Sequence, residues 1–172
     1  MHAVQEILGY DIEVVRNDVI DYEVLDTMEY IILSPGPGIP QEAGDLKKVI
    51  NQYSSSKKIL GVCLGHQAIG ECFGATLKNL EKVYHGVQTS VSLLEDDPVL
   101  NKVEKPLEVG RYHSWVIQRD TLPDVFTITS EDDKGEIMSM KHKTLPIYGV
   151  QFHPESILTP QGNIMLNNFL NV

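Results

Sequence analysis

The sequence predicts a three-layer α/β fold, in which helices cover a mostly parallel central sheet that carries a smaller antiparallel section. Two observations lead to this prediction. Short apolar runs alternate with segments of helical spacing in the first part of the chain and again at its end, as in parallel sheets joined by helices. From residue 87 onward, strand-like segments follow one another without helices between them, which indicates antiparallel pairing.

The first elements are predicted from capping and alternation. Residues 3–8 are expected as a helix that ends at Gly9, because glycine commonly terminates helices in the left-handed conformation. Residues 11–16 alternate between polar and apolar side chains and are expected as a strand. Further strands are expected at 30–33, 59–62, 87–93, 125–129, 136–140 and 147–152, and further helices at 42–53 and 161–170.

Length and composition restrict the class of protein. With 172 residues, the chain can bury a sizeable core, and we expect one domain over residues 1–172. The net charge of −10 argues against a nucleic-acid partner, although ordinary solubility equally explains an acidic surplus. Two cysteines suit neither a zinc site nor a disulfide framework. Because no secretory segment and no long apolar stretch is present, we expect a cytoplasmic protein that does not enter a membrane.

The most informative segment, from residue 59 to residue 67, reads Ile-Leu-Gly-Val-Cys-Leu-Gly-His-Gln. A buried strand is expected to end at Cys63, and Gly61 and Gly65 stand two residues to either side. This spacing is typical of a nucleophile elbow, in which the reactive side chain lies on a tight turn between a strand and a helix. The helix N-terminus favours the thiolate, and its N–H groups can stabilise an oxyanion.

A free cysteine is more often a small buried side chain than a nucleophile, and we interpret Cys72 in that way. A reactive Cys63 needs a base, and that base needs an acceptor to orient it. His153 and Glu155 offer both at the end of a later apolar strand, with Pro154 stiffening the segment between them. Parallel strands end at one edge of a sheet, so Cys63 and His153 are expected to meet there. A structural role is the alternative for this histidine.

Four sequence blocks stand out along the chain. They are Leu33-Ser34-Pro35-Gly36-Pro37-Gly38, Gly61-Val62-Cys63-Leu64-Gly65-His66-Gln67, Arg111-Tyr112-His113-Ser114-Trp115 and Gly149-Val150-Gln151-Phe152-His153-Pro154-Glu155-Ser156. Together, and in this order, they resemble the class I (triad) glutamine amidotransferases. The resemblance covers essentially the whole chain and is closest to members that serve anthranilate synthase or aminodeoxychorismate synthase.

The resemblance implies a reaction and its catalytic residues. Cys63 would attack the side-chain amide of glutamine, His153 would pass a proton to the departing ammonia, and Glu155 would orient the imidazole. The resulting thioester would then hydrolyse to glutamate. The backbone of Leu64 and the loop around Gly36 would supply the N–H groups that hold the oxyanion.

The resemblance also implies a substrate-binding set, which lies around the same turn. Its members are Gly36, Pro37, Gly38, Leu64, Gln67, Ser114 and Trp115. Gln67 and the backbone of Ser114 and Trp115 would hold the polar ends of glutamine. Structural roles stay open as alternatives: Pro-Gly pairs commonly form turns, Gln67 could lie on a helix surface, His113 could hydrogen-bond at a strand end, and a tryptophan is more often core than ligand contact.

Free ammonia needs an acceptor, and the chain contains no phosphate-binding loop and no second domain. The resemblance therefore implies a separate, larger synthase subunit that aminates chorismate. We expect no cofactor and no metal on this chain, and magnesium only on the partner. A stand-alone cysteine hydrolase of γ-glutamyl type and a non-enzymatic regulatory subunit stay open as alternatives.

One departure from the family concerns the beginning of the sequence. Family members open with an apolar strand and an Asp-Asn-Tyr-Asp-Ser-Phe-like loop before the first helix. This sequence opens at Met1-His2-Ala3-Val4, inside the expected position of that helix. Loss of a central strand would leave backbone groups of its neighbours unpaired. We therefore favour a sequence that starts late over a protein that is truly shortened.

Overall fold

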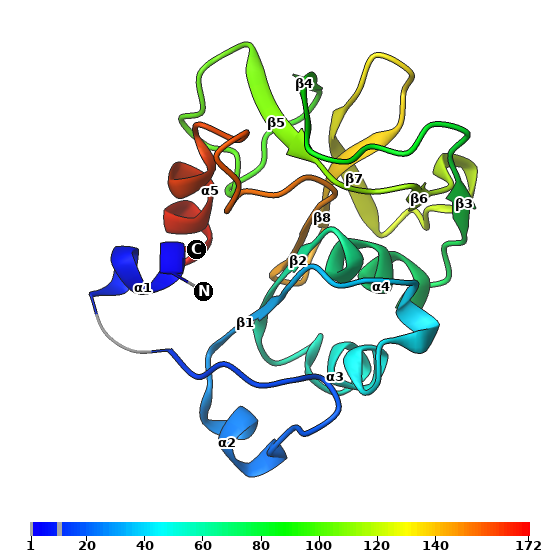
Figure 1. The fold of residues 1–172 in the computed structure, drawn as a ribbon. Coiled ribbons are helices and arrows are strands. Elements are labelled where there is room, and N and C mark those ends of the chain that lie inside the picture. Colours follow the sequence, from blue (N-terminus) through cyan, green and yellow to red (C-terminus); the bar gives the residue numbers. More distant parts are fainter. Residues whose placement is uncertain (1, 10–11) are drawn as a thin grey trace.

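The computed structural model describes residues 2–9 and 12–172 (Figure 1). Within these residues the central sheet has seven strands, which lie in the order β1 (Tyr30–Leu33), β2 (Lys58–Val62), β9 (Ile147–Val150), β8 (Ile137–His142), β7 (Phe126–Glu131), β4 (Val87–Leu93) and β5 (Leu107–Arg111). The first three strands are parallel neighbours. The remaining pairs are antiparallel, so the sheet is mixed and not mostly parallel as predicted, because the strands from residue 87 onward join the same sheet. A separate small sheet pairs β3 (Leu77–Asn79) with β6 (Trp115–Ile117) in antiparallel fashion.

Helices cover both faces of the sheet, which confirms the predicted three-layer arrangement (Figure 1). On one face α3 (Leu46–Tyr53) and α4 (Leu64–Cys72) pack over a core that includes Ile59. On the other face α1 (His2–Leu8) and α5 (Gly162–Phe169) pack over a core that includes Leu60. A short helix, α2 (Tyr22–Thr27), and 3-10 turns at Pro40–Glu42 and Arg119–Thr121 complete the elements. No helix in the described part of the chain is long and apolar enough to cross a membrane.

The N-terminal predictions have different outcomes. Helix α1 ends as expected, and Gly9, with φ of 72°, donates its N–H to the Gln5 carbonyl at 2.8 Å. The strand predicted for 11–16 is wrong over its described part. Residues 12–16 form no strand, and the neighbouring side chains of Val14 and Val15 are 57% and 48% exposed. Asp11 lies outside the described residues. Alternation alone does not make a strand when no partner strand supplies hydrogen bonds, and none in the described residues pairs with this segment.

Other elements differ from prediction at their ends. The helix predicted for 42–53 begins only at Leu46, because Gly44 takes a φ of 53° that interrupts the helical backbone. A Cβ atom at Gly44 would lie 2.8 Å from the Asn17 carbonyl oxygen. Strand β9 ends at Val150 rather than at residue 152, although the Gln151 N–H still donates to the Met138 carbonyl at 2.9 Å. The parallel strands β2 and β9 therefore end side by side.

Candidate active site

The predicted strand-to-helix turn is present at Cys63. This residue follows β2 directly and caps α4, with φ of 52° and ψ of −99°. Its N–H donates to the Val150 carbonyl at 2.8 Å, and its own carbonyl accepts from the Gln67 N–H at 3.1 Å. A positive φ is uncommon for any residue with a side chain. The backbone therefore holds the thiol at a sharp bend fixed from both sides.

The two glycines around Cys63 are required by close packing. A Cβ atom at Gly61 would lie 2.5 Å from the backbone carbon of Gly65. A Cβ atom at Gly65 would lie 2.3 Å from the carbonyl oxygen of Leu33, at the end of β1. Real Cβ atoms do not approach backbone so closely, since the overlap is strongly repulsive. Glycine at both positions lets the first turn of α4 lie directly on the strands.

The glycine-rich loop that follows β1 lies beside this turn. A Cβ atom at Gly36 would be 2.8 Å from Leu64 Cδ2, and Gly38 has φ of 76°. The first N–H groups of a helix have no acceptor within it, and Leu64 is the first residue of α4. The structure thus brings the predicted oxyanion loop, including the exposed Pro37, next to the free backbone donors of α4.

His153 and Glu155 form the predicted pair. The His153 Nδ1 atom hydrogen-bonds to Glu155 Oε1 at 2.8 Å. They lie in a turn after β9 rather than in an extended segment. The backbone of this turn is fixed, because the His153 N–H donates to the Gly110 carbonyl at 3.0 Å and the Thr159 hydroxyl donates to the His153 carbonyl at 2.6 Å. The other ring nitrogen, Nε2, is buried and has no hydrogen-bond partner among the described residues.

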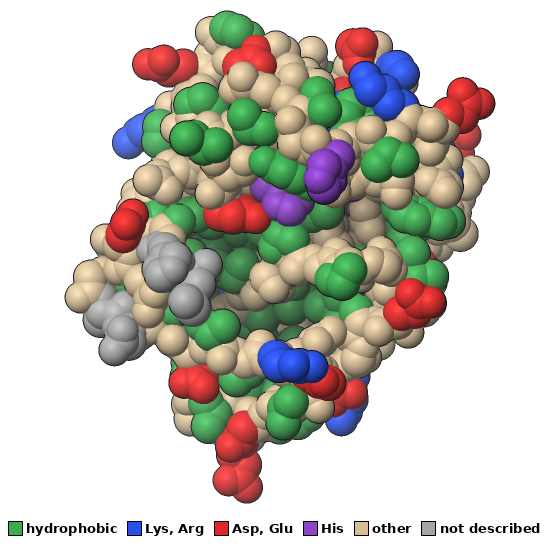
Figure 2. Space-filling model, in the orientation of Figure 1, with side chains coloured by type: hydrophobic (Ala, Val, Ile, Leu, Met, Phe, Trp, Pro, Cys, Tyr) green, Lys and Arg blue, Asp and Glu red, His purple; other side chains and the backbone are tan. Residues whose placement is uncertain are grey.

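Charges around the imidazole favour its protonated form. Burial lowers the pKa of His153, but Cys63 and Glu155 act against burial, and together they raise that pKa to about 9. Burial likewise raises the pKa of Glu155, yet the hydrogen bond to His153, the charge of that ring and a backbone hydrogen bond together outweigh burial and hold the pKa below its ordinary value. At neutral pH this pKa favours an imidazolium that is paired with the Glu155 carboxylate. Figure 2 shows a hollow on this face of the molecule with histidine side chains at its rim.

Gln67 and Trp115 are brought together by a direct hydrogen bond. Gln67 is 3% exposed, and its Nε2 donates to the Trp115 carbonyl at 2.7 Å and to Gln151 Oε1 at 3.2 Å. The Trp115 carbonyl also accepts from His113 Nδ1 at 3.1 Å, which occupies both of its lone pairs. The Ser114 carbonyl accepts from the Leu80 N–H at 2.7 Å. The strand-end hydrogen-bonding role left open for His113 is thus present. Gln67 is buried, so its alternative position on a helix surface is wrong, and Oε1 of its amide takes part in neither of these bonds.

Sequence reasoning missed two side chains at the site. Gln151 is fully buried, and its Nε2 donates to Cys63 Sγ at 3.6 Å. Tyr112 is 38% exposed and lies over His153, with ring centroids 4.7 Å apart, while its hydroxyl bonds to Ser156 Oγ at 3.0 Å. A signal for Gln151 was present, since an uncharged polar residue in an otherwise apolar strand needs a buried partner. Tyr112 carried no such signal.

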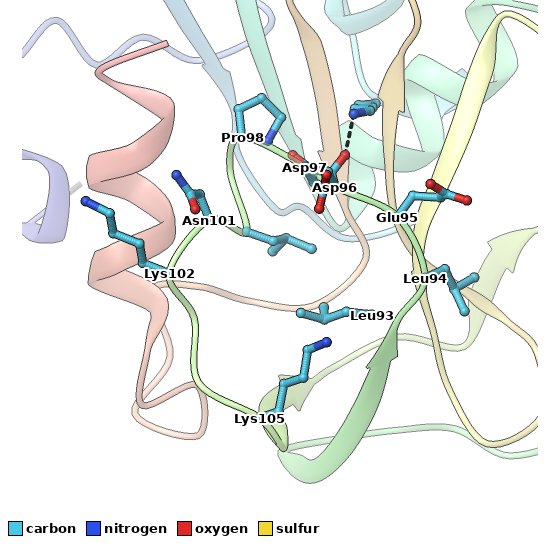
Figure 3. Close-up of a pocket in the computed structure, with 11 residues that line it drawn as sticks. Leu93, Leu94, Glu95, Asp96, Asp97, Pro98, Asn101, Lys102 and Lys105 are labelled. Carbon is cyan, nitrogen blue, oxygen red and sulfur yellow. Dashed lines mark hydrogen bonds between the residues drawn. The ribbon is translucent and has the colours of Figure 1, made fainter.

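A cavity lies away from the Cys63 turn. It has a volume of about 750 Å³ and follows the connection from β4 to β5, as Figure 3 shows. Acidic and basic side chains mix along its wall, including Glu95, Lys102 and Lys105, and Lys141 Nζ donates to the Asp96 carbonyl. None of the predicted site residues lines it. Its mixed charge favours no single class of ligand.

A comparison with protein families decides the class. The family model described as glutamine amidotransferase class-I matches residues 2–172. The chain belongs to this family. The resemblance predicted from the four sequence blocks is therefore confirmed, and the chain is an amidotransferase of the Cys-His-Glu triad type.

Individual relatives of this amidotransferase differ in length. The chain is 45% identical over 164 residues to the bifunctional protein TrpGD of Thermotoga maritima, covering 94% of this chain but only 28% of that protein. It is 41% identical over 165 residues to the aminodeoxychorismate/anthranilate synthase component 2 of Bacillus subtilis, covering 95% of this chain and 84% of that protein. A solved structure of a protein from Thermoplasma acidophilum, described as part of a GMP synthase, superposes with a TM-score of 0.86 at 32% identity, covering 98% of this chain and 83% of that one.

Proposed function

We propose that this amidotransferase is the glutaminase subunit of a synthase that aminates chorismate. It hydrolyses glutamine to glutamate and ammonia, and a larger synthase subunit uses the ammonia to make anthranilate. The observation that carries the chemistry is the His153–Glu155 pair acting on Cys63 at the N-terminus of α4. The name of the Bacillus subtilis relative supports the pathway, since it includes anthranilate synthase.

The first half-reaction forms a thioester. The Cys63 thiolate attacks the side-chain carbonyl carbon of glutamine, and the carbonyl oxygen takes the negative charge. The N–H of Leu64 and those of the Gly36–Gly38 loop stabilise this oxyanion, an interaction for which each donor is typically worth roughly 3–4 kcal/mol of barrier. When the intermediate collapses, the imidazolium of His153 protonates the leaving nitrogen, and ammonia departs.

The second half-reaction releases glutamate. His153 is then neutral and takes a proton from a water molecule, whose oxygen attacks the thioester carbon. Collapse of this second intermediate breaks the carbon–sulfur bond and restores the thiolate beside the imidazolium. Glu155 holds the Nδ1 side of the ring throughout, so the same nitrogen always faces the sulfur and the substrate.

Glutamine binding uses the residues around the same turn. The Oε1 atom of Gln67 accepts from the α-ammonium group of glutamine, since the Nε2 protons are used within the protein. The Trp115 carbonyl is occupied, so Ser114 and Trp115 contribute N–H groups rather than this carbonyl. Gly36, Pro37 and Gly38 close the other side of the substrate side chain. All of these residues belong to the single amidotransferase domain that we propose for residues 1–172.

The product of the partner has two candidates. The name of the Bacillus subtilis relative includes both anthranilate synthase and aminodeoxychorismate synthase. Both reactions use chorismate and an ammonia donor, so the amidotransferase chemistry is the same for either. We place anthranilate first and keep aminodeoxychorismate as the second candidate, with magnesium bound only by the partner.

Reconstitution tests the proposal. The chain is combined separately with an anthranilate-forming and an aminodeoxychorismate-forming synthase, and each mixture receives chorismate with glutamine or with ammonium chloride. We expect low glutaminase turnover of the chain alone and a strong rise when chorismate and the matching synthase are present. The Gly36–Gly38 loop is the expected switch, because its glycines allow an oxyanion N–H to be presented or withdrawn. Full activity of the lone chain, unchanged by either synthase, would instead support a stand-alone hydrolase.

A further inference from the structure

Gln151 occupies an unusual position for a polar side chain. It follows β9 immediately, is fully buried, and precedes the turn that carries His153 by two residues. Its backbone N–H continues the sheet by donating to the Met138 carbonyl at 2.9 Å. Because buried amides are costly unless both ends are hydrogen-bonded, the partners of its side chain indicate why a glutamine stands here.

Both ends of the Gln151 amide are used by other side chains at the site. Nε2 donates to Cys63 Sγ at 3.6 Å, and Oε1 accepts from Gln67 Nε2 at 3.2 Å. A sulfur atom accepts at longer distances than oxygen because it is larger. The glutamine therefore links the nucleophile to the helix that the nucleophile caps, through a contact that no sequence motif describes.

A chain of buried hydrogen bonds fixes which end of this amide faces the sulfur. The chain begins at Arg111, whose guanidinium donates to Asp132 Oδ2 at 2.8 Å, with both side chains at most 1% exposed. Arg111 Nε also donates to His113 Nε2 at 3.2 Å. Because a guanidinium only donates, the ring proton of a neutral His113 must be on Nδ1. Burial and Arg111 lower the pKa of His113 to about 3, in agreement with a neutral ring.

The Trp115 carbonyl fixes the remaining links. His113 Nδ1–H donates to the Trp115 carbonyl, which also accepts from the Gln67 side chain. Since a carbonyl only accepts, the Gln67 atom that faces Trp115 must be nitrogen, and its second proton is directed at Gln151. The Gln151 atom that receives this proton must be oxygen, which leaves the N–H end facing Cys63 Sγ.

We propose that Gln151 is a further catalytic residue, whose side-chain N–H binds the Cys63 sulfur and stabilises the thiolate in the orientation for attack. Gln67, His113 and Arg111 act through it as positioning residues. The inference rests on the proposed function for its biological meaning. Hydrogen bonding to a charged form favours that form, and a donor fixed in a buried network loses no orientation when the charge develops. The Cys63 thiolate is thus stabilised by two groups, the imidazolium of His153 and the side-chain N–H of Gln151.

The main test is alkylation of the Cys63 thiolate, which needs neither glutamine nor a partner. In a Gln151→Met variant the side chain keeps its length but cannot donate. The rate at which iodoacetamide alkylates Cys63 at neutral pH is expected to fall about tenfold, because hydrogen bonds to charged groups are among the stronger ones. The midpoint of the pH–rate profile of alkylation is expected to rise by about one unit. In the glutaminase assay kcat falls while KM for glutamine changes little, since Gln151 is buried.

A matched control separates this effect from a general loss of packing. Ser139 is fully buried on the neighbouring strand β8 and faces Val150 in register, and its hydroxyl bonds to Thr129 and Ser130 at 2.6 Å each. Ser139→Ala is expected to lower the thermal midpoint without moving the alkylation profile. A stably folded Gln151→Met variant whose alkylation rate and profile equal those of the parent overturns the proposal.

A second variant keeps the inference testable if Gln151→Met does not fold. Gln67→Met leaves the Gln151 donor present but removes the proton that fixes its orientation. Its alkylation rate is expected to fall by about threefold, in the same direction but less than for loss of the donor. An unchanged profile in a folded Gln67→Met variant also overturns the proposal. Because these measurements use only the isolated chain, their failure is distinguishable from failure of ammonia transfer to a synthase.

Discussion

Helix α4 has a cysteine at each end, and the two thiols lie in opposite environments. Cys63 caps the helix, whereas Cys72 is its last residue. Cys72 Sγ donates to the Lys47 carbonyl at 3.7 Å, and burial raises the pKa of this thiol to about 11. Cys63 is the more deeply buried of the two, so exposure does not distinguish the proposed nucleophile from the other thiol. What distinguishes it is a donor on Gln151, an imidazolium on His153 and the free N–H groups of the helix N-terminus.

Removal of each sulfur tests this contrast most strongly. Cys63→Ala is expected to reduce glutamine-dependent synthesis by about 10³-fold or more, since loss of a nucleophile removes the covalent route. The same complex should retain synthesis from ammonium chloride, because the thiol produces ammonia but does not use it. Cys72→Ala, the matched control, should leave both rates within twofold. Retained glutaminase activity in the Cys63 variant would exclude it as the nucleophile.

Substitutions of His153 and Glu155 are expected to reduce glutaminase turnover by different amounts. His153→Ala should lower glutaminase turnover by about 10²–10⁴-fold, the usual range for a general acid–base group. Glu155→Gln should cost less, because an amide still accepts from the imidazole but stabilises its cation poorly. Steady-state turnover with saturating glutamine measures both. If Glu155→Gln had the parent rate, Glu155 would not be the third member of the triad.

Selective labelling compares the two thiols within one molecule. At neutral pH a thiol with a pKa of about 11 is a thiolate in only about 10⁻⁴ of molecules. A glutamine-like chloroketone should therefore modify Cys63 at least about 100-fold faster than Cys72. Peptide mapping after limited reaction gives the ratio, and unfolded protein gives the reference for equal reactivity. Labelling of Cys72 before Cys63 would contradict the prediction that Cys63 is the more reactive thiol.

The smallest expected effect concerns stability. The folded pKa of His153 is about 9, above the ordinary value of 6.5, so its protonation stabilises the fold fully below pH 6.5. That contribution is lost as pH rises through 9. Glu155 is 39% exposed and its ion pair is screened, so the thermal midpoint should fall by only about 2–4 °C between pH 6.5 and pH 9. His153→Gln should remove this part of the pH dependence, and an unchanged slope would contradict the pairing.

The sequence predicted those features of the site that depend on a few neighbouring residues. The bend at Cys63 and the His153–Glu155 pair depend on spacing within a few residues, and the parallel pairing of β2 with β9 then brings the two segments together. The link between Gln151 and the sulfur depends on residues far apart in the chain, so the local pattern indicates only that Gln151 needs a buried partner and not which one. Val14 and Val15 show the opposite case, because alternation predicted a strand there and no described strand pairs with it.

The bend at Cys63 has a consequence for protein engineering. Its φ of 52° and ψ of −99° represent a conformation that typically costs about 1–3 kcal/mol for a residue with a side chain. Glycine tolerates such angles, although it also increases the entropy of the unfolded chain. Directed evolution for heat resistance alone would therefore favour glycine at this position and enrich inactive proteins. Selection for thermostability of this chain should be coupled to glutamine turnover from the first round.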